Sequence, residues 1–429
     1  MIRFASIKCA FVGFRWGTEG FADNIPAHLP ERSYQTVGPE SGQPSTTFSR
    51  FFPFEIPPDM NASGQIVSVN LGSRSYQISI GFGNLPNIGF LLHEWLQLSD
   101  TQPLRCFVVT DTNVLQPHAN SVKKALSTSG AEVRVVCVKA GEGSKSLKEA
   151  SDLFDELVDF KADRRTVVIA VGGGVIGDLA GFVAATYARG LPFVQIPTTL
   201  LAMVDSSVGG KTGINHPKGK NLIGAFHQPV GVLIDIDIMS TLPEREYRSG
   251  LAEVIKYGVI MDAAFFDYLE QNVAGLNDRD PGVVTQIVAR SCQLKAEVVQ
   301  QDEYETTGLR AMLNYGHTYA HAFEALGGYG ALLHGEAVSI GMVCACRLAR
   351  KLGRIGDAEV IRQTNLLKAV QLPVDVPDAL QTRTEDILNC MLLDKKTVSG
   401  DLKFVLPDRI GHVETVGGVN PRSVIECIS

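Results

Sequence analysis

Apolar and polar residues follow two different rhythms along this chain, and the change between them comes near residue 238. Before it, short β-branched runs alternate with helical segments, and after it helical spacing dominates. Strands that alternate with helices are typical of a parallel sheet covered on both faces. We therefore predict an α/β domain over residues 65–238 and a mostly α-helical domain over residues 239–429. The predicted strands are residues 66–70, 76–80, 106–114, 133–138, 166–171 and 193–196.

The helical half carries polar residues at spacings that indicate buried positions. Glu253 and Lys256, within the helical stretch 244–270, are three residues apart and therefore on one face, among apolar neighbours. An exposed ion pair is the usual interpretation of such a pair, but these neighbours favour burial. His334 begins another apolar helix, 337–352, and the dipole at a helix N-terminus favours a neutral imidazole.

A single polar stripe is predicted on the helix after Gly308. Arg310, Asn314, His317 and His321 fall at positions i, i+4, i+7 and i+11, and the remaining positions are mostly apolar. A helix that is apolar on most sides is buried, so we expect the stripe to line a cavity. One histidine there would usually be a core residue, whereas two in register with Arg and Asn indicate a site.

The strand at 166–171 runs into a glycine-rich turn. Gly172, Gly174 and Gly177 have the spacing G-x-G-x-x-G, which lets backbone N–H groups approach a pyrophosphate at a helix N-terminus. Glycine turns also serve plain packing, and the acidic residue expected about twenty positions on is absent, with Arg189 in that region instead. The turn predicts a Rossmann-like nucleotide-binding domain of unusual form.

Polar residues also follow the earlier strands. Asp111 and Asn113 come after one strand, and Glu142 and Lys145 after the next. Ligands of open α/β sheets lie at the carboxyl ends of strands, so these four are candidates for nucleotide contact. Helix capping and surface charge are the alternative interpretation.

Composition narrows the range of possible functions and cellular locations. The chain has 429 residues and a formal net charge of −7, which argues against nucleic-acid binding, and no apolar run reaches membrane-spanning length. The eight cysteines form no C-x-x-C pair, and five of them have apolar neighbours, which predicts buried reduced thiols and a cytoplasmic protein. These five are Cys106, Cys137, Cys292, Cys344 and Cys346. Residues 1–64 lack periodicity and are expected to be a disordered extension, with Met60 as a possible true start.

The segments 203–215 and 219–229 set Asp205, Lys211, Lys220 and Asn221 among glycines and apolar residues. With these motifs the chain, from about Val67 to its end, resembles the dehydroquinate synthases, which are sugar phosphate cyclases. The resemblance implies conversion of 3-deoxy-D-arabino-heptulosonate 7-phosphate to 3-dehydroquinate and phosphate. The steps implied are transient oxidation at C5 by tightly bound NAD, phosphate elimination, reduction, and intramolecular aldol closure. A homodimer is also implied.

The resemblance assigns roles to individual residues. It implies cofactor contacts by Asp111, Asn113, Glu142, Lys145, Gly173, Gly174, Val175, Asp178, Thr198, Thr199 and Thr241. It implies substrate contacts by Arg189, Asp205, Lys211, Lys220, Asn221, Lys256, Lys295, Arg310, Asn314, His321, Lys395 and Lys396. Catalytic roles are expected for Lys211, Lys256, His321, Asn221 and Glu305. A basic cluster inside an acidic protein suits a substrate with a phosphate and a carboxylate.

A catalytic zinc site needs three protein ligands and an open position. By spacing alone His317 and His321 could both be ligands, but the glutamate of an H-E-x-x-H motif is absent. The resemblance implies Glu253, His317 and His334 as ligands of zinc or cobalt, with His321 facing substrate. One departure concerns the acidic residue that the family places four positions before Arg310. Thr306 stands there after a one-residue insertion, and Glu305 is the expected substitute.

Other functions remain as alternatives. A related cyclase could act on another sugar phosphate, although Asn314 and His321 match the dehydroquinate synthases and not the valiolone-type cyclases. An enzyme for an amino-substituted substrate has nearly the same motifs. A metal- and NAD-dependent polyol dehydrogenase shares the two-domain design but would give net NADH. A nucleotide-binding scaffold without activity would not need the Arg-Asn-His-His stripe.

Overall fold

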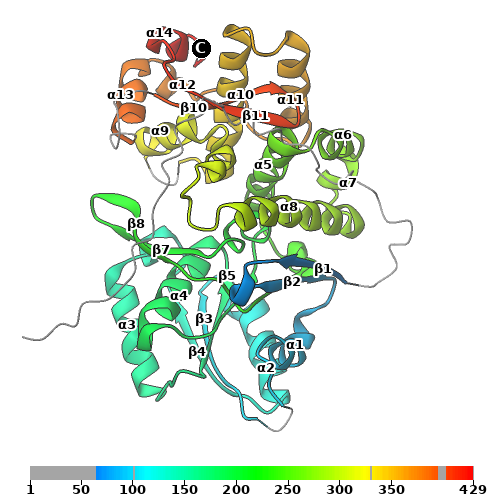
Figure 1. Cartoon of the computed structure of the whole chain (residues 1–429), viewed down its shortest axis with the longest axis vertical. Helices are drawn as coiled ribbons and strands as arrows, with labels where there is room; N and C mark the ends of the chain where they lie inside the picture. The colour runs from blue at the N-terminus through cyan, green and yellow to red at the C-terminus, as the bar shows by residue number, and fades with distance from the viewer. Residues whose placement is uncertain (1–63, 100–101, 329–330, 395–401, 429) are drawn as a thin grey trace, which may run out of the picture. The chain divides into compact units, whose positions relative to one another are not determined.

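The computed structural model describes residues 64–99, 102–328, 331–394 and 402–428 (Figure 1). The predicted extension up to residue 63, Met60, Lys395 and Lys396 lie outside the described residues. The described residues form a main sheet of seven strands. In spatial order these are β1 (Gln65–Val69), β2 (Tyr76–Gly81), β9 (Gly231–Asp235), β6 (Phe193–Pro197), β5 (Val167–Gly172), β3 (Arg105–Asp111) and β4 (Glu132–Val138).

Apolar patterning explains where each strand lies. Every residue of β5, β6 and β9 is buried, which continuous apolar runs require of central parallel strands. Strands β1 and β2 form an antiparallel pair at the sheet edge, and their side chains alternate between buried and exposed. The α/β class is confirmed, and the six predicted strands all exist within one to three residues of their predicted bounds.

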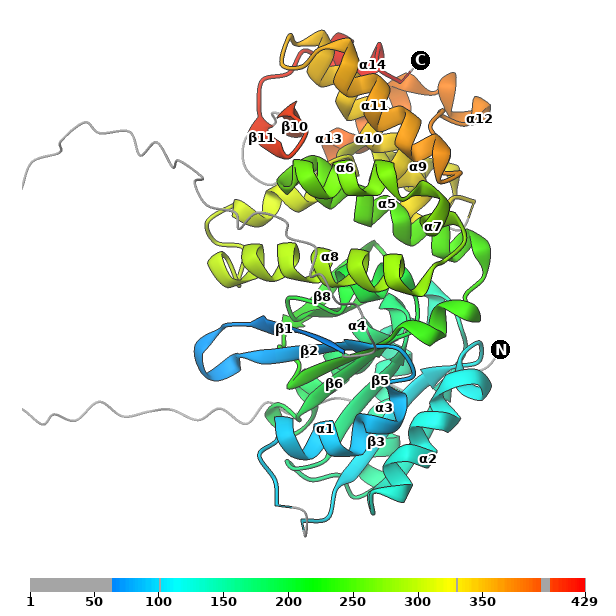
Figure 2. The ribbon, with the colours of Figure 1, turned by 90° about the vertical axis from the view of Figure 1, so that its right-hand side faces the viewer.

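Helices cover both faces of the sheet (Figures 1 and 2). One face carries α1 (Ile88–Trp95) and α2 (Asn120–Thr128), and the other carries α3 (Leu147–Asp159) and α4 (Gly174–Thr186). Strand β9 was not predicted, and neither was the hairpin of β7 (Lys211–His216) and β8 (Gly219–Phe226), whose glycines and polar residues obscure a strand pattern. The hairpin packs on α4, where Thr212 lies against Gly181.

The C-terminal part is mainly helical, as predicted. Its elements are α5 (Glu244–Met261), α6 (Ala263–Gln271), α7 (Val273–Asn277), α8 (Pro281–Gln301), α9 (His317–Gly327), α10 (His334–Lys351), α11 (Asp357–Ala369), α12 (Asp378–Gln381), α13 (Thr384–Asp394), β10 (Phe404–Arg409), β11 (His412–Val416) and α14 (Pro421–Ile425). One hydrophobic core joins these helices to β1, β2 and β9. The division at residues 238 and 239 therefore stays a prediction.

Two predictions of local structure are wrong. The helix expected after Gly308 is not continuous, because a 3-10 helix (Leu309–Asn314) ends at extended Tyr315, and α9 begins only after Gly316. The stripe from Arg310 to His321 is thus broken between Asn314 and His317. Cys137 is exposed rather than buried, while the four other cysteines with apolar neighbours are buried as expected. Its strand β4 is the edge of the sheet, with no further described strand on one side.

Gly316 fixes where α9 starts and hence where His317 points. Its φ is +79°, and a Cβ there would lie 2.8 Å from the backbone nitrogen of Met342 in α10. Gly308 has a similar φ of +82° but open space around it. The first position requires glycine for both conformation and contact, and the second for conformation alone.

We predict that Gly316→Ala destabilises the protein more than Gly308→Ala. A left-handed non-glycine residue costs about 1–2 kcal/mol at either position, and overpacking against α10 adds about 1–3 kcal/mol at Gly316. Urea unfolding midpoints of the two variants measure the difference. Equal losses would show that the close contact of α9 with α10 does not constrain Gly316.

Candidate functional site

Glu253, His317 and His334 come together from three helices. Glu253 lies within α5, and each histidine is the first residue of its helix. One donor atom from each lies within 4.8 Å of the others, with Nε2 of His317 and of His334 3.7 Å and 3.8 Å from Glu253 Oε1. Three donors bound tetrahedrally at about 2.1 Å stand about 3.4 Å apart, so the group needs little movement to hold a metal ion.

The Glu253 carboxylate is buried without a full set of partners. It is 1% exposed and forms an ion pair with Lys256, yet neither oxygen accepts a hydrogen bond from a described residue. Buried charge is tolerated when it is paired or binds a metal. The carboxylate therefore has the open coordination that a divalent cation would satisfy, and the expected burial of Glu253 and Lys256 is confirmed.

The pKa values of the two histidines are shifted in opposite directions. Burial and the Lys256 ammonium hold the pKa of His317 well below its usual value, which favours the neutral imidazole that metals bind. Burial also lowers the pKa of His334, but Glu324 and Glu253 outweigh it and raise that pKa overall. Glu324 Oε2 lies 3.5 Å from Nδ1 of His334, so this carboxylate opposes the neutral form that the helix dipole is expected to favour.

A second group of charges surrounds Asp205. Lys295 Nζ lies 2.7 Å from Asp205 Oδ1, and the Tyr257 hydroxyl donates to the same oxygen at 3.2 Å. Burial alone would raise the pKa of Asp205, but the ammonium groups of Lys295 and Lys256 outweigh it and hold the pKa below its usual value. Lys256 faces both this group and Glu253 and so connects the two.

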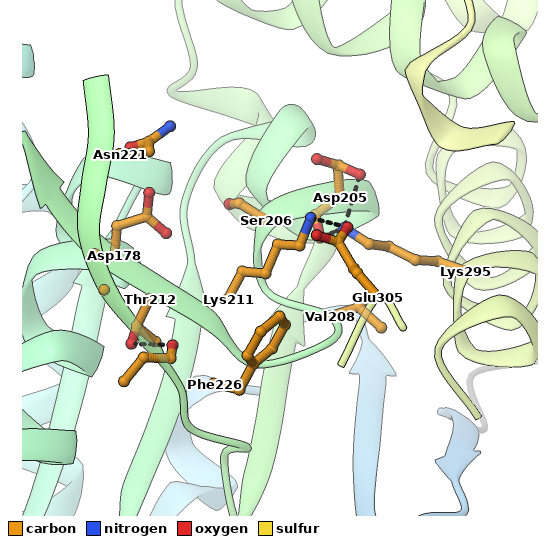
Figure 3. A pocket seen from close by; sticks show the side chains of 13 residues that line it. Asp178, Asp205, Ser206, Val208, Lys211, Thr212, Asn221, Phe226, Lys295 and Glu305 are labelled. Atoms are coloured by element: carbon orange, nitrogen blue, oxygen red, sulfur yellow. Dashed lines mark hydrogen bonds and ion pairs between the residues drawn. The ribbon is translucent and has the colours of Figure 1, made fainter. Parts of the chain in front are cut away.

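A cavity of about 520 Å³ adjoins these charges (Figure 3). Predicted site residues form much of its wall, namely Asp178, Asp205, Lys211, Asn221, Lys295 and Glu305. Sequence reasoning missed Ser206 and Phe226, which also line it. Glu253, His317 and His334 are not among its lining residues, but Asp205 lines it and interacts electrostatically with Lys256, the ion-pair partner of Glu253.

Glu305 lies on the cavity wall beside cations. It forms an ion pair with Lys211 from β7, and its Oε1 lies 3.8 Å from Nε of Arg310. Arg310 is 2% exposed, and its Nε has no hydrogen-bond partner among the described residues. The loop with the insertion is held by Asp302, which accepts from the backbone nitrogens of Thr306 and Thr307 at 2.8 Å and 3.0 Å. The Glu305 backbone adopts a left-handed φ of 57°.

The predicted nucleotide contacts meet around Lys145. Its Nζ lies 2.6 Å from Asp178 Oδ2 and 2.5 Å from Asn221 Oδ1, and it is 5% exposed. Glu142 accepts from Asn215 Nδ2 at 2.7 Å. These bonds join the loop before α3, helix α4 and the hairpin.

The glycine turn leaves space at the N-terminus of α4. A Cβ on Gly173 would lie 3.1 Å from Thr199 Cγ2, and one on Gly174 would lie 3.1 Å from Ser206 Oγ. The buried hydroxyls of Thr198 and Ser206 have no hydrogen-bond partner among the described residues. Open hydroxyls and a glycine-capped helix start fit the phosphates of a dinucleotide.

Other predicted residues lie elsewhere. Arg189 is exposed on the turn after α4, and Asn314 is exposed at the end of the 3-10 helix. His321 is exposed with its ring 5.5 Å from that of His317. Asp111 accepts from the backbone nitrogen of Asn113, and the Thr241 hydroxyl lies 2.7 Å from buried His118 Nε2. Lys220, Val175 and Thr199 lie at the hairpin, at the start of α4 and after β6.

Comparison with known proteins gives one consistent family. The family model for the N-terminal part of 3-dehydroquinate synthase matches residues 135–249, and the model for its C-terminal part matches residues 250–397. The 3-dehydroquinate synthase of Desulforamulus reducens is 49% identical over 365 residues, which cover 85% of this chain and 99% of the relative. That of Rhodopirellula baltica is 48% identical over 365 residues, 84% of this chain and 96% of the relative.

Comparison with solved structures shows which proteins have a similar fold. A 2-epi-5-epi-valiolone synthase from Streptomyces hygroscopicus, with NAD⁺ and Zn²⁺ bound, is 29% identical with a TM-score of 0.74, covering 82% of this chain and 95% of that one. A 2-deoxy-scyllo-inosose synthase with carbaglucose-6-phosphate, NAD⁺ and Co²⁺ is 24% identical with a TM-score of 0.76, covering 85% and 99%. At nearly half identity over almost the whole length of its relatives, this chain belongs to the 3-dehydroquinate synthase family.

Proposed function

We propose that this chain, a carbon–oxygen lyase of the 3-dehydroquinate synthase family, performs its reaction in the cavity at Lys211 and beside Glu253. The substrate is 3-deoxy-D-arabino-heptulosonate 7-phosphate, and the products are 3-dehydroquinate and phosphate. The observation that carries this assignment is a buried, incompletely satisfied carboxylate flanked by two imidazoles and joined through lysines to a cavity.

The residues fit both expected cofactors. Glu253, His317 and His334 would hold zinc or cobalt, and the turn at Gly173 and Gly174 would hold NAD with the open hydroxyl of Thr198. Two related cyclases contain these two kinds of cofactor. When bound, the cation supplies Lewis acidity and NAD supplies reversible hydride acceptance.

The cationic side chains would bind the anionic ends of the substrate. Lys211 and Arg310 already surround one carboxylate, that of Glu305, and therefore form a ready anion site. Lys295 would contribute from α8, oriented by Asp205. Holding both ends of the substrate keeps the intermediate in place between oxidation and reduction.

Proton movement would use groups next to the three donors. Lys256 is fully buried beside Glu253, and His321 stands against His317. We propose that these side chains handle protons at the reacting hydroxyl, and that Asn221 positions the substrate from the hairpin. Glu305 would release Lys211 when the substrate arrives, since an anionic group of the substrate would replace the carboxylate.

A dehydrogenase is the second candidate. The glycerol dehydrogenase of Schizosaccharomyces pombe shares the fold at 19% identity and a TM-score of 0.56. An amino-substituted substrate is a further alternative. The family match at nearly half identity favours the cyclase.

Assembly and location are also proposed. We expect a homodimer in the cytoplasm, acting on a small sugar phosphate without nucleic acid or membrane. Exposed apolar side chains such as Phe82 and Phe90 offer surface for a second copy, and four of the five cysteines discussed above are buried as free thiols. Among the described residues no helix has the length and apolarity needed to cross a membrane.

The first prediction concerns the metal. His317→Ala should lose bound zinc and turnover while remaining folded, because the site drops from three protein ligands to two. Elemental analysis measures bound zinc, an activity assay measures turnover, and circular dichroism measures folding. His93→Ala, a change on α1, is the matched control and should keep its zinc. Full zinc occupancy in His317→Ala would refute the ligand assignment.

The second prediction concerns the anion site. Lys211→Ala should weaken substrate binding by about 1.5–3 kcal/mol, the usual range for a lost charged hydrogen bond, and largely spare NAD binding. Calorimetry with the NAD-free protein measures substrate affinity, and a titration with NAD measures cofactor affinity. Lys218→Ala, at the exposed turn of the same hairpin, should leave substrate affinity unchanged. An equal loss in both variants would mean that Lys211 acts only through general charge.

The third prediction separates the cyclase from the dehydrogenase. A cyclase that oxidises and then reduces the same carbon should complete many turnovers per NAD without accumulating NADH. Substrate deuterated at C5 should keep its label in the dehydroquinate formed. Absorbance and mass spectrometry follow these two quantities, while free phosphate and dehydroquinate appear together. Stoichiometric NADH that carries the label would favour the dehydrogenase, and loss of the label to solvent would contradict the return of the hydride.

A further inference from the structure

Glu324 is a partly buried acidic residue that none of the roles above uses. It lies on α9 seven residues after His317, so both side chains leave the same face of the helix. Its side chain is 13% exposed. Oε2 lies 3.5 Å from Nδ1 of His334, and Oε1 lies 4.0 Å from Nζ of Lys220 on the hairpin. The carboxylate thus contacts the side of His334 that faces away from Glu253.

The two histidine rings have the same orientation relative to Glu253, with Nε2 toward its carboxylate and Nδ1 toward an acceptor. His317 Nδ1 lies 3.1 Å from the backbone oxygen of Tyr315, which leaves its Nε2 directed at Glu253. His334 Nδ1 faces Glu324, and its Nε2 is likewise directed at Glu253. An acceptor at Nδ1 places the proton there and frees the Nε2 lone pair for a metal, and such acceptors also fix the ring orientation.

We propose that Glu324 is a positioning residue that orients His334 and fixes its Nδ1–H tautomer, so that Nε2 binds the divalent cation. This inference rests on the proposed metal site. It does not make Glu324 a ligand, since its oxygens face Nδ1 and Lys220. His317 uses a backbone carbonyl for the same purpose and cannot be altered by a side-chain substitution, whereas the support of His334 can.

Lys220 gives the arrangement a second consequence. Its ammonium lies 4.0 Å from Oε1, the other carboxylate oxygen of Glu324. Lys220 belongs to β8, the hairpin strand that also carries Asn221. The carboxylate therefore ties a helix of the C-terminal part to the hairpin beside the cavity.

The test measures metal affinity rather than turnover. Zn²⁺ affinity of the full chain is determined by competition with a chromogenic chelator, and the visible spectrum of the Co²⁺-loaded protein reports ligand geometry. Glu324→Ala should weaken Zn²⁺ binding 10–100-fold and alter the Co²⁺ spectrum, the range usual for lost partners of metal-bound histidines. Glu324→Gln should weaken it at least threefold, because an amide oxygen still accepts from Nδ1 but carries no charge. Glu94→Gln, on α1, should match the unaltered protein.

The outcomes separate this inference from the proposed metal site. If the unaltered protein binds no stoichiometric Zn²⁺, or His317→Ala binds as well as it does, the metal site itself is refuted. If both behave as expected and Glu324→Ala binds Zn²⁺ within twofold of the unaltered protein with the same Co²⁺ spectrum, the role of Glu324 is refuted. Should Glu324→Ala fail to fold, the near-isosteric Glu324→Gln decides, and binding within twofold refutes the role.

Discussion

The burial of the Glu253 carboxylate is the constraint on which the rest of the site depends. A charge removed from water is costly unless it is paired and hydrogen-bonded, and among the described residues Glu253 has an ion pair but no hydrogen-bond donor. Lys256 neutralises the charge but leaves Oε1 facing two imidazole nitrogens. The fold therefore holds an incompletely satisfied group in its core, which is a stability cost that an occupied metal site would remove.

The first residues of α9 and α10 place the two imidazoles beside Glu253. His317 and His334 each occupy the first position of a helix, where backbone conformation changes abruptly and the side chain direction is fixed by the residue before it. Gly316 in the left-handed region and extended Leu333 set those directions. Close contact between Gly316 and Gly341 then fixes the distance between the two helices. The three donors are thus placed by rigid elements, while the lysines that face the cavity come from the hairpin and from α8.

Sequence patterns predicted the sheet well because its strands are continuous apolar runs bounded by glycine or polar residues, as in β5 and β6. They failed at residues 315–316, where helical spacing on both sides concealed a left-handed glycine and an interrupted helix. Glu324 was missed for the same reason, since the true stripe begins at His317 and continues to that residue. The hairpin was missed because Gly213 and Gly224 lie opposite each other, where a side chain would clash with the neighbouring backbone. Tertiary contact rather than propensity determines such strands.

The separation of the three donors from the cavity fits the proposal that one site oxidises and reduces the same carbon. Asp205 lines the cavity and is held by Lys295 on α8, whereas Lys256 pairs with Glu253 on α5. A substrate gripped at its anionic end by Lys211 and Arg310 would present its hydroxyl across this boundary toward the donors. The grip would then come from the hairpin and the 3-10 helix, and the reacting centre from α5, α9 and α10, so the anionic end could change from ester to free phosphate without disturbing the carbon that receives the hydride back. A dehydrogenase has no need of such a division, because its product leaves after one hydride transfer.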